Sequence, residues 1–165
     1  MTTSVLIADD SPFIRTAYKR ILETQEDLQV SAVVEDGRAA VEAAEEIELD
    51  VAILDVRMPR LDGITAGKKI RESSPSTSIV IVSAFDDWTY IQDLVEIDPS
   101  AKAYILKNSL DDIGELIRVV RQVRKGYVIF DHVLVDKLIG YYAVSYTHLR
   151  AHETLRYLVC RLLLE

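Results

Sequence analysis

The chain has 165 residues and a formal net charge of −8, and 49% of its residues are apolar. These values fit one folded domain, or one domain with part of another. The acidic balance argues against a broad nucleic-acid or membrane-surface footprint. No apolar run approaches the roughly 20 residues that cross a bilayer, and the single cysteine, Cys160, excludes an internal disulfide framework. The N-terminus lacks the features of a signal peptide, so we expect a cytoplasmic location.

Five short apolar runs predict five strands, at residues 5–8, 28–34, 51–54, 79–82 and 103–106. The runs are nearly continuous, which is typical of parallel strands covered on both faces. Apolar residues at helical spacing lie between and after them. The stripes are Phe13, Ile14, Ala17, Ile21 and Leu22; Ala40, Val41, Ala44 and Ile47; Ile64, Gly67 and Ile70; Trp88, Ile91 and Val95; and Leu110, Ile113, Ile117, Val120 and Val123.

This alternation predicts an α/β fold. We expect a flavodoxin-like, doubly wound, five-stranded parallel sheet with helices on both faces. The length of the chain favours the strand order 2-1-3-4-5, with right-handed crossovers. In such sheets functional groups gather at the carboxyl ends of the strands.

Polar residues follow four of the predicted strands. Asp9-Asp10 follows the first, Asp55 the third, Ser83 the fourth and Lys107 the fifth. Carboxylates that lie close together repel one another, and Mg²⁺, which prefers oxygen ligands, relieves that repulsion. An aspartate can attack phosphorus, and Mg²⁺ and an ammonium can neutralise the charge that develops. The residues together predict a phosphoryl-acceptor site built on an aspartate.

Each feature also has a plainer interpretation. Asp9-Asp10 before Ser11-Pro12 fits an ordinary helix start, and Asp62-Gly63 fits a turn or another helix start. A single lysine such as Lys107 is usually a solvated surface residue, and Ser83 by itself indicates nothing. The placement of all these residues after successive strands favours the site.

The chain resembles the receiver domain of a two-component response regulator over about residues 3–125. The matching features, in order, are Asp9-Asp10, the run Asp55-Val56-Arg57-Met58-Pro59-Arg60-Leu61-Asp62-Gly63, Ser83-Ala84, and Tyr104 through Lys107. The resemblance implies that a sensor histidine kinase phosphorylates Asp55. It also implies that Asp10, Asp55 and the backbone carbonyl of Arg57 bind Mg²⁺, with Asp9 acting nearby or through water.

The resemblance further implies a conformational switch. Lys107 would pair with the phosphoryl group, Ser83 would move toward it, and Tyr104 would swing inward. A half-buried strand tyrosine is the alternative for Tyr104. The face of the fourth helix, fifth strand and fifth helix would then dimerise or bind an effector. We expect no enzyme activity beyond weak autodephosphorylation. Two departures are Asn108, where many relatives have proline, and residues 98–102, which lack the usual Gly-Ala.

Residues 126–143 are similar to the linker of LuxR/NarL-type regulators. Gly126 is expected to end the fifth helix, and Asp131 to cap a short helix that runs to Ile139. In those regulators a helix-turn-helix domain follows the linker, and DNA binding would depend on that absent domain. A stand-alone receiver that acts by protein contact is the alternative. An aspartate-nucleophile phosphatase is disfavoured, because Arg57 occupies the position of its second acid.

The segment from Val144 to Glu165 matches the translation of a transposase-type sequencing adapter. The fixed bases read in frame as residues 144–154 and 158–165, around a short variable index. A natural helix with His148 and His152 at metal-like spacing is the alternative, but no third ligand is in sight. We therefore expect a receiver domain at 1–125, a linker at 126–143, and a poorly packed, adapter-derived tail at 144–165.

Overall fold

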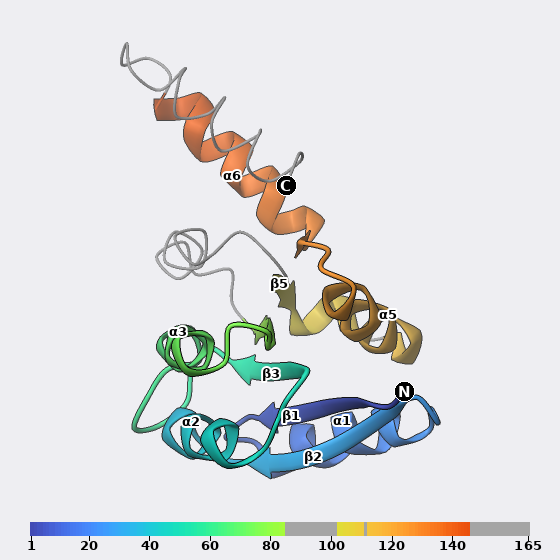
Figure 1. Cartoon of the computed structure of the whole chain (residues 1–165). Coiled ribbons are helices and arrows are strands. Elements are labelled where there is room, and N and C mark those ends of the chain that lie inside the picture. Colours follow the sequence, from blue (N-terminus) through green and yellow to red (C-terminus); the bar gives the residue numbers. More distant parts are fainter. Residues whose placement is uncertain (85–101, 111, 146–165) are drawn as a thin grey trace. The chain divides into compact units, whose positions relative to one another are not determined.

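The computed structural model describes residues 1–84, 102–110 and 112–145 (Figure 1). The helix expected around Trp88–Val95 and the part of the tail from residue 146 onward lie outside the described residues. Contacts between residues divide the chain into two units, Met1–Ile129 and Phe130–Glu165. Among the described helices, none combines the length and the apolar character needed to cross a bilayer.

The first unit is built on a sheet whose strands alternate with helices, as expected. The strands are β1 (Thr3–Ala8), β2 (Leu28–Val34), β3 (Val51–Asp55), β4 (Ser78–Ser83), β5 (Lys102–Leu106) and β6 (Ile129–Phe130). The helices of this unit are α1 (Pro12–Glu23), α2 (Gly37–Glu46), α3 (Gly63–Ser73), a 3₁₀ helix (Lys107–Leu110) and α5 (Ile113–Arg124), and the second unit contains α6 (His132–Ser145).

The strand order is β2-β1-β3-β4-β5-β6. Strands β1 to β5 pair in parallel and follow the predicted order 2-1-3-4-5. The predicted number of strands was one too few, because β6 adds an edge strand of two residues that is too short to show in an apolar pattern.

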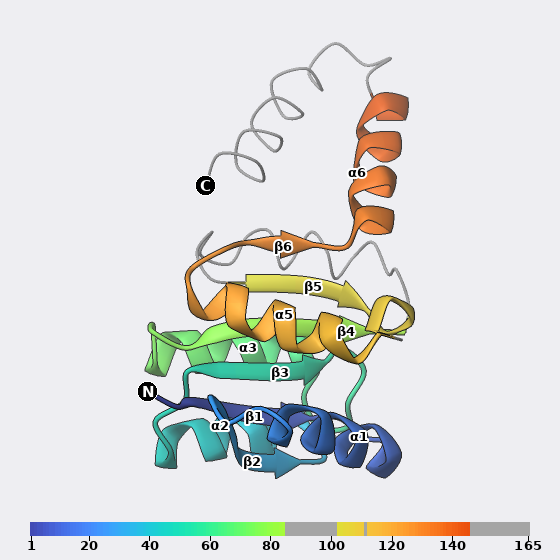
Figure 2. The ribbon, with the colours of Figure 1, turned by 90° about the vertical axis from the view of Figure 1, so that its right-hand side faces the viewer.

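Helices cover both faces of the sheet. Figure 2 shows α1 and α5 in front of the strands and α2 and α3 behind them. The front core joins alternate residues of the strands to the two helices. Its members include Val5, Ile7, Val51, Ile53, Val80, Val82, Leu22, Leu116 and Val120. On the opposite face Gly67 of α3 comes close to Ile79 and Leu54. Side chains of β1, β3 and β4 are therefore buried on both faces, which explains their continuous apolar runs.

The helices begin at side chains that cap them. Ser11, Asp36, Asp62 and Asp112 accept hydrogen bonds from the backbone N–H groups of Ile14, Ala39, Thr65 and Gly114. Such caps satisfy N–H groups that have no partner within the helix. Because α1, α2 and α3 directly follow β1, β2 and β3, three helices begin at the carboxyl edge of the sheet. The predicted helix starts at Ser11-Pro12 and Asp62-Gly63 are both present.

Among the described residues assigned to apolar stripes, two are exposed to solvent. Phe13 is 79% exposed and Ile113 is 59% exposed. Both lie in the first turn of their helices, beside the loops at the sheet edge rather than over the strands. Tyr18, which the pattern did not single out, is buried instead.

The segment after α5 begins as expected. Gly126 takes a φ of 95° directly after α5, and Asp131 accepts a hydrogen bond from Val133 N–H at the start of α6. Helix α6 continues beyond Ile139 to Ser145, so the predicted end of this helix was too early. Its last residues, Val144 and Ser145, come from the segment that matches the adapter.

Substitutions at the two ends of the α1 stripe should differ in their effect on the free energy of unfolding. Leu22→Ala should lower the free energy of unfolding by about 2–5 kcal/mol, because Leu22 is fully buried and its removal leaves a cavity. Phe13→Ala, on the same helix, should change it by less than about 0.5 kcal/mol. Urea unfolding followed by circular dichroism measures both values. Equal losses in the two variants would contradict the placement of α1.

Candidate functional site

The register of the sheet brings the predicted site residues to one edge. Ala8 pairs with Leu54, so Asp9 and Asp55 follow neighbouring positions in β1 and β3. Asp55 pairs with Val82, the residue before Ser83. Ser83 in turn pairs with Leu106, the residue before Lys107. The hypothesis that these residues converge at the carboxyl edge therefore agrees with the backbone.

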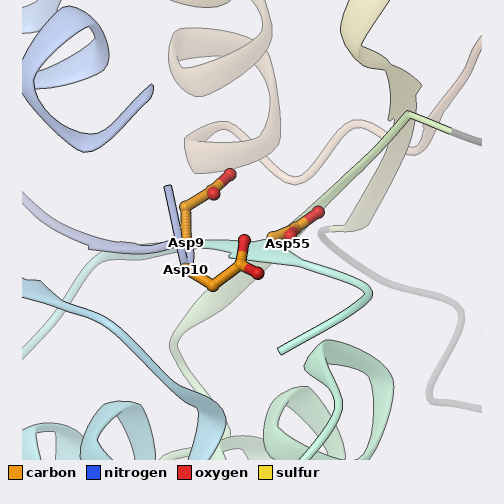
Figure 3. A group of neighbouring side chains, drawn as sticks. All are labelled: Asp9, Asp10 and Asp55. Atoms are coloured by element: carbon orange, nitrogen blue, oxygen red, sulfur yellow. The ribbon is translucent and has the colours of Figure 1, made fainter. Parts of the chain in front are cut away.

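Three carboxylates form the centre of the site (Figure 3). One oxygen from each of Asp9, Asp10 and Asp55 lies within 4.8 Å of the others. Asp9 and Asp55 are buried, with exposed fractions of 1% and 7%, whereas Asp10 is exposed. Clustered carboxylate oxygens that are open to solvent on one side suit a hard divalent cation that keeps several of its waters. The residues present therefore fit Mg²⁺.

Lys107 connects two of these carboxylates. Its Nζ lies 2.9 Å from Asp9 Oδ2 and 3.4 Å from Asp55 Oδ1. The lysine is the first residue of the 3₁₀ helix that follows β5, and its side chain is 20% exposed. A lysine that the sequence alone allowed to be a surface residue thus lies inside the acidic cluster.

The charges in the cluster shift the protonation of its members. Burial, followed by the negative charge of Asp9, raises the pKa of Asp55 to about 6, although Lys107 opposes the shift. Burial favours a lower pKa for Lys107, but its hydrogen bond to Asp9 and the charges of both carboxylates raise the pKa overall. Burial, together with the same carboxylates, also raises the pKa of the Tyr18 hydroxyl on α1. Asp55 therefore lies in a site with excess negative charge.

Asp9 makes two further contacts besides the ion pair with Lys107. Its Oδ1 accepts a hydrogen bond of 2.9 Å from Ser11 N–H, and its carbonyl accepts one of 2.6 Å from the Arg15 guanidinium. Arg15 was not among the predicted site residues. Nothing in the spacing of α1 distinguishes it from the other basic residues of that helix, so only the fold reveals this contact.

The start of α3 packs directly against the backbone of Asp55. A Cβ atom on Gly63 would lie 2.0 Å from the Asp55 carbonyl oxygen, so only glycine fits there. Gly63 N–H also donates to the Val56 carbonyl. The Asp-Gly pair of the motif therefore has two structural roles: Asp62 caps α3, and Gly63 lets the helix approach Asp55.

The remaining predicted residues have the following positions. Ser83 ends β4 and is 2% exposed, and Tyr104 in β5 is fully buried in this structure. Arg57 is exposed at the start of the loop between β3 and α3. The proposed movements of Ser83 and Tyr104 and the metal contact of the Arg57 carbonyl stay predictions.

Comparison with known proteins agrees with this fold. A family model described as the response regulator receiver domain matches residues 5–136. The oxygen regulatory protein NreC of Staphylococcus epidermidis is 41% identical over 137 residues, which make up 82% of this chain and 61% of NreC. The chain therefore belongs to the response regulator receiver family, as the motif predicted.

Solved structures extend the comparison. A LuxR-family DNA-binding response regulator from Staphylococcus aureus superimposes with a TM-score of 0.66 at 27% identity, covering 74% of this chain and 98% of that one. The receiver domain of AraT from Geobacillus stearothermophilus gives 0.64 at 33% identity, covering 76% of this chain and 95% of that one. Among curated relatives, NreC and the Bacillus subtilis regulatory protein YxjL are each matched over only 61% of their length.

The raised pKa of Asp55 predicts how stability depends on pH. The unfolded chain has an ordinary aspartate pKa near 4, so the folded state binds more protons between about pH 4 and the folded pKa of about 6. Stability from this residue is therefore fully present below pH 4 and is lost as the pH rises through 6.

Asp55→Asn should consequently unfold at a higher urea concentration than the parent chain at pH 7 in EDTA. We expect a gain of roughly 1–3 kcal/mol that shrinks as the pH falls from 6 to 4. Excess Mg²⁺ should reverse the order, because asparagine lacks the negative charge that Asp55 would offer to a bound cation. A variant less stable than the parent at pH 7 in EDTA would contradict the electrostatic account.

Proposed function

We propose that Asp55 accepts a phosphoryl group from the phosphohistidine of a sensor histidine kinase. The observation that carries the proposal is the position of Lys107 Nζ between Asp9 and Asp55, within a cluster of three carboxylates. Response regulators as a family are phosphorylated by such kinases, and the family match supports the same donor class here. The chain would act as an acceptor and a switch rather than as a catalyst of many turnovers.

Asp10, Asp55 and the Arg57 carbonyl are the proposed ligands of Mg²⁺, with Asp9 beside them or acting through water. Receiver domains bind Mg²⁺ at an acidic pocket of this kind. When bound, the cation would supply charge neutralisation for the carboxylates and for the phosphoryl oxygens. Asp9 is already occupied by Ser11 N–H on one oxygen and by Lys107 on the other, which supports its secondary role.

The transfer follows from the geometry of Asp55 and Lys107. A carboxylate oxygen of Asp55 attacks phosphorus, a P–O bond forms, and the P–N bond to the donor histidine breaks. The electron pair of the P–N bond stays on the imidazole nitrogen. The ring takes up one proton from solvent and so becomes the neutral imidazole of the donor histidine. The Lys107 ammonium, 3.4 Å from Asp55 Oδ1, is placed to neutralise a phosphoryl oxygen on that carboxylate.

Phosphorylation would then shift a balance between two conformations. Lys107 and Ser83 would contact the phosphoryl group, and Tyr104 would act as the switch aromatic. Tyr104 is fully buried in this structure, which is the inward position that the proposed switch assigns to the phosphorylated state. A homodimer or an effector contact would use the face formed by the fourth helix, β5 and α5.

The whole protein is proposed to be a DNA-binding transcription regulator. The LuxR-family match and the relatives' greater length support a second, C-terminal domain beyond this chain. DNA binding would belong to that domain. A stand-alone receiver that signals by protein contact is the alternative. Under both proposals the residues from 144 onward would come from the adapter and not from the natural gene.

Acetyl phosphate provides a direct test of the acceptor. With Mg²⁺, the parent chain should gain one phosphoryl group by intact-mass spectrometry, and Asp55→Asn should gain none. Asp112→Asn is the matched control, because asparagine caps a helix as well as aspartate does and Asp112 lies at α5 instead of the site. Uptake by Asp55→Asn at the parent rate would show that the site is wrong.

The uninterrupted genomic sequence tests the wider proposal. Reading through residue 143 should reveal a natural sequence different from residues 144–165, followed by the pattern of a helix-turn-helix domain. A stop codon soon after Tyr142 would support the stand-alone receiver. A genomic sequence that encodes residues 144–165 as they stand would contradict the adapter origin.

A further inference from the structure

The loop between β3 and α3, residues 56–62, is held by α2 as well as by its own ends. At its ends Val56 N–H donates to the Val82 carbonyl, and Gly63 N–H donates to the Val56 carbonyl. Its middle, at Arg60 and Leu61, contacts the first turn of α2. This loop carries Arg57, whose carbonyl is the proposed backbone ligand of Mg²⁺.

Asp36 is the side chain through which α2 holds the loop. It is 2% exposed, and its Oδ1 accepts a hydrogen bond of 2.8 Å from Ala39 N–H at the helix start. Its other oxygen, Oδ2, lies 3.2 Å from Nη1 of Arg60. One buried carboxylate thus caps α2 with one oxygen and pairs with the loop through the other.

Arg60 needs such a partner because of its backbone. Its φ of 68° lies in the left-handed region, where a residue with a Cβ atom is strained. Strain of this kind persists only where the surroundings impose it. The ion pair with Asp36 is the contact that draws the Arg60 side chain toward α2.

Gly37 brings the two backbones together. A Cβ atom on Gly37 would lie 2.2 Å from the Leu61 carbonyl oxygen and 2.9 Å from its carbonyl carbon. These two nearest atoms are backbone, which cannot move aside as the end of a flexible side chain can. The Asp36-Gly37 pair therefore supplies both a charge and a close approach to adjacent loop residues.

We propose that Asp36, Gly37 and Arg60 are positioning residues that set the β3–α3 loop for Mg²⁺ binding. The loop conformation that presents the Arg57 carbonyl is then determined partly from α2, which has none of the proposed ligands. This inference rests on the proposed function, since it assumes that the acidic cluster binds Mg²⁺. Outer partners of this kind commonly tune metal affinity.

The test measures Mg²⁺ binding to the full chain by isothermal titration calorimetry. Asp36→Asn keeps a good helix cap but removes the charge, and Arg60→Asn keeps a residue that tolerates a positive φ but removes the guanidinium. Each should weaken Mg²⁺ binding by about three- to tenfold, as expected for losing one partly exposed ion pair. The double variant should be no weaker than the worse single variant, because both remove the same contact.

The control is Asp112→Asn, the same substitution at the cap of α5. It should leave the Mg²⁺ affinity unchanged. Hydrogen exchange in metal-free buffer supplies a second readout: the amides of residues 57–62 should exchange faster in Asp36→Asn than in the parent chain or the control. At saturating Mg²⁺ the rate of phosphorylation by acetyl phosphate should return to the parent value, since only the position of the loop is affected.

Gly37→Ala tests the close approach separately. The added methyl group should displace Leu61 and weaken Mg²⁺ binding at least as much as Asp36→Asn. Gly114→Ala is its control, because a Cβ atom there meets only the Asp112 side chain, at an ordinary 3.4 Å. Parent-like Mg²⁺ affinity and loop exchange in Asp36→Asn and Arg60→Asn would overturn the inference. A parent chain that binds no Mg²⁺ at all would instead overturn the proposed function on which it rests.

Discussion

The site depends on a charge imbalance at the carboxyl edge of the sheet. Asp9 and Asp55 are both buried, Asp10 lies beside them, and the ammonium of Lys107 lies between the first two. Burying charge is costly unless it is paired, and one cation does not balance three carboxylates. The raised pKa of Asp55 is the electrostatic consequence. An arrangement of this kind favours the binding of a cation at the three carboxylates, because added positive charge lowers their mutual repulsion.

The scaffold makes this imbalance tolerable by holding the charged groups from several directions. The parallel register places Asp55, Ser83 and Lys107 after adjacent strands. Backbone groups also take part, as Ser11 N–H does for Asp9. The loop that follows Asp55 contacts the start of α2 through Asp36 and Gly37. Neither residue is a proposed ligand of Mg²⁺ or of the phosphoryl group. The precision of the site therefore comes from helix starts that gather at the same edge.

Much of this architecture could be predicted from the sequence, because buried parallel strands leave a clear apolar signal. The five main strands, their order and the family all follow from the runs and the motif. The first turns of α1 and α5 were misjudged, since helical periodicity alone does not show where a helix extends past the strands. Phe13 and Ile113 fit their stripes and yet are exposed.

Part of the site was predictable because the strands themselves are easy to recognise. Four of its residues come directly after a predicted strand: Asp9, Asp10, Asp55 and Lys107. The contacts of Arg15 and Arg60 are made by long side chains, and residue spacing in the sequence does not indicate them. Asp36-Gly37 did offer a signal: a capping residue and a glycine shortly after the second strand. That pair, however, looks the same whether the glycine merely begins a helix or also lies against a neighbouring backbone.

The close packing of Gly63 on the Asp55 carbonyl has a consequence for the evolution and engineering of the chain. The loop begins at Val56, whose carbonyl accepts a hydrogen bond from Gly63, and it ends at Asp62, whose carboxylate caps α3. Both anchors are fixed in space, so the number of residues between them is fixed as well. Arg60 within this stretch pairs with Asp36, so its side chain is constrained as well. One residue added or removed would move Gly63 away from the Asp55 carbonyl on which it packs. The number of residues between Asp55 and Gly63 is therefore constrained. Insertions that carry labels or reporters should be placed in other loops.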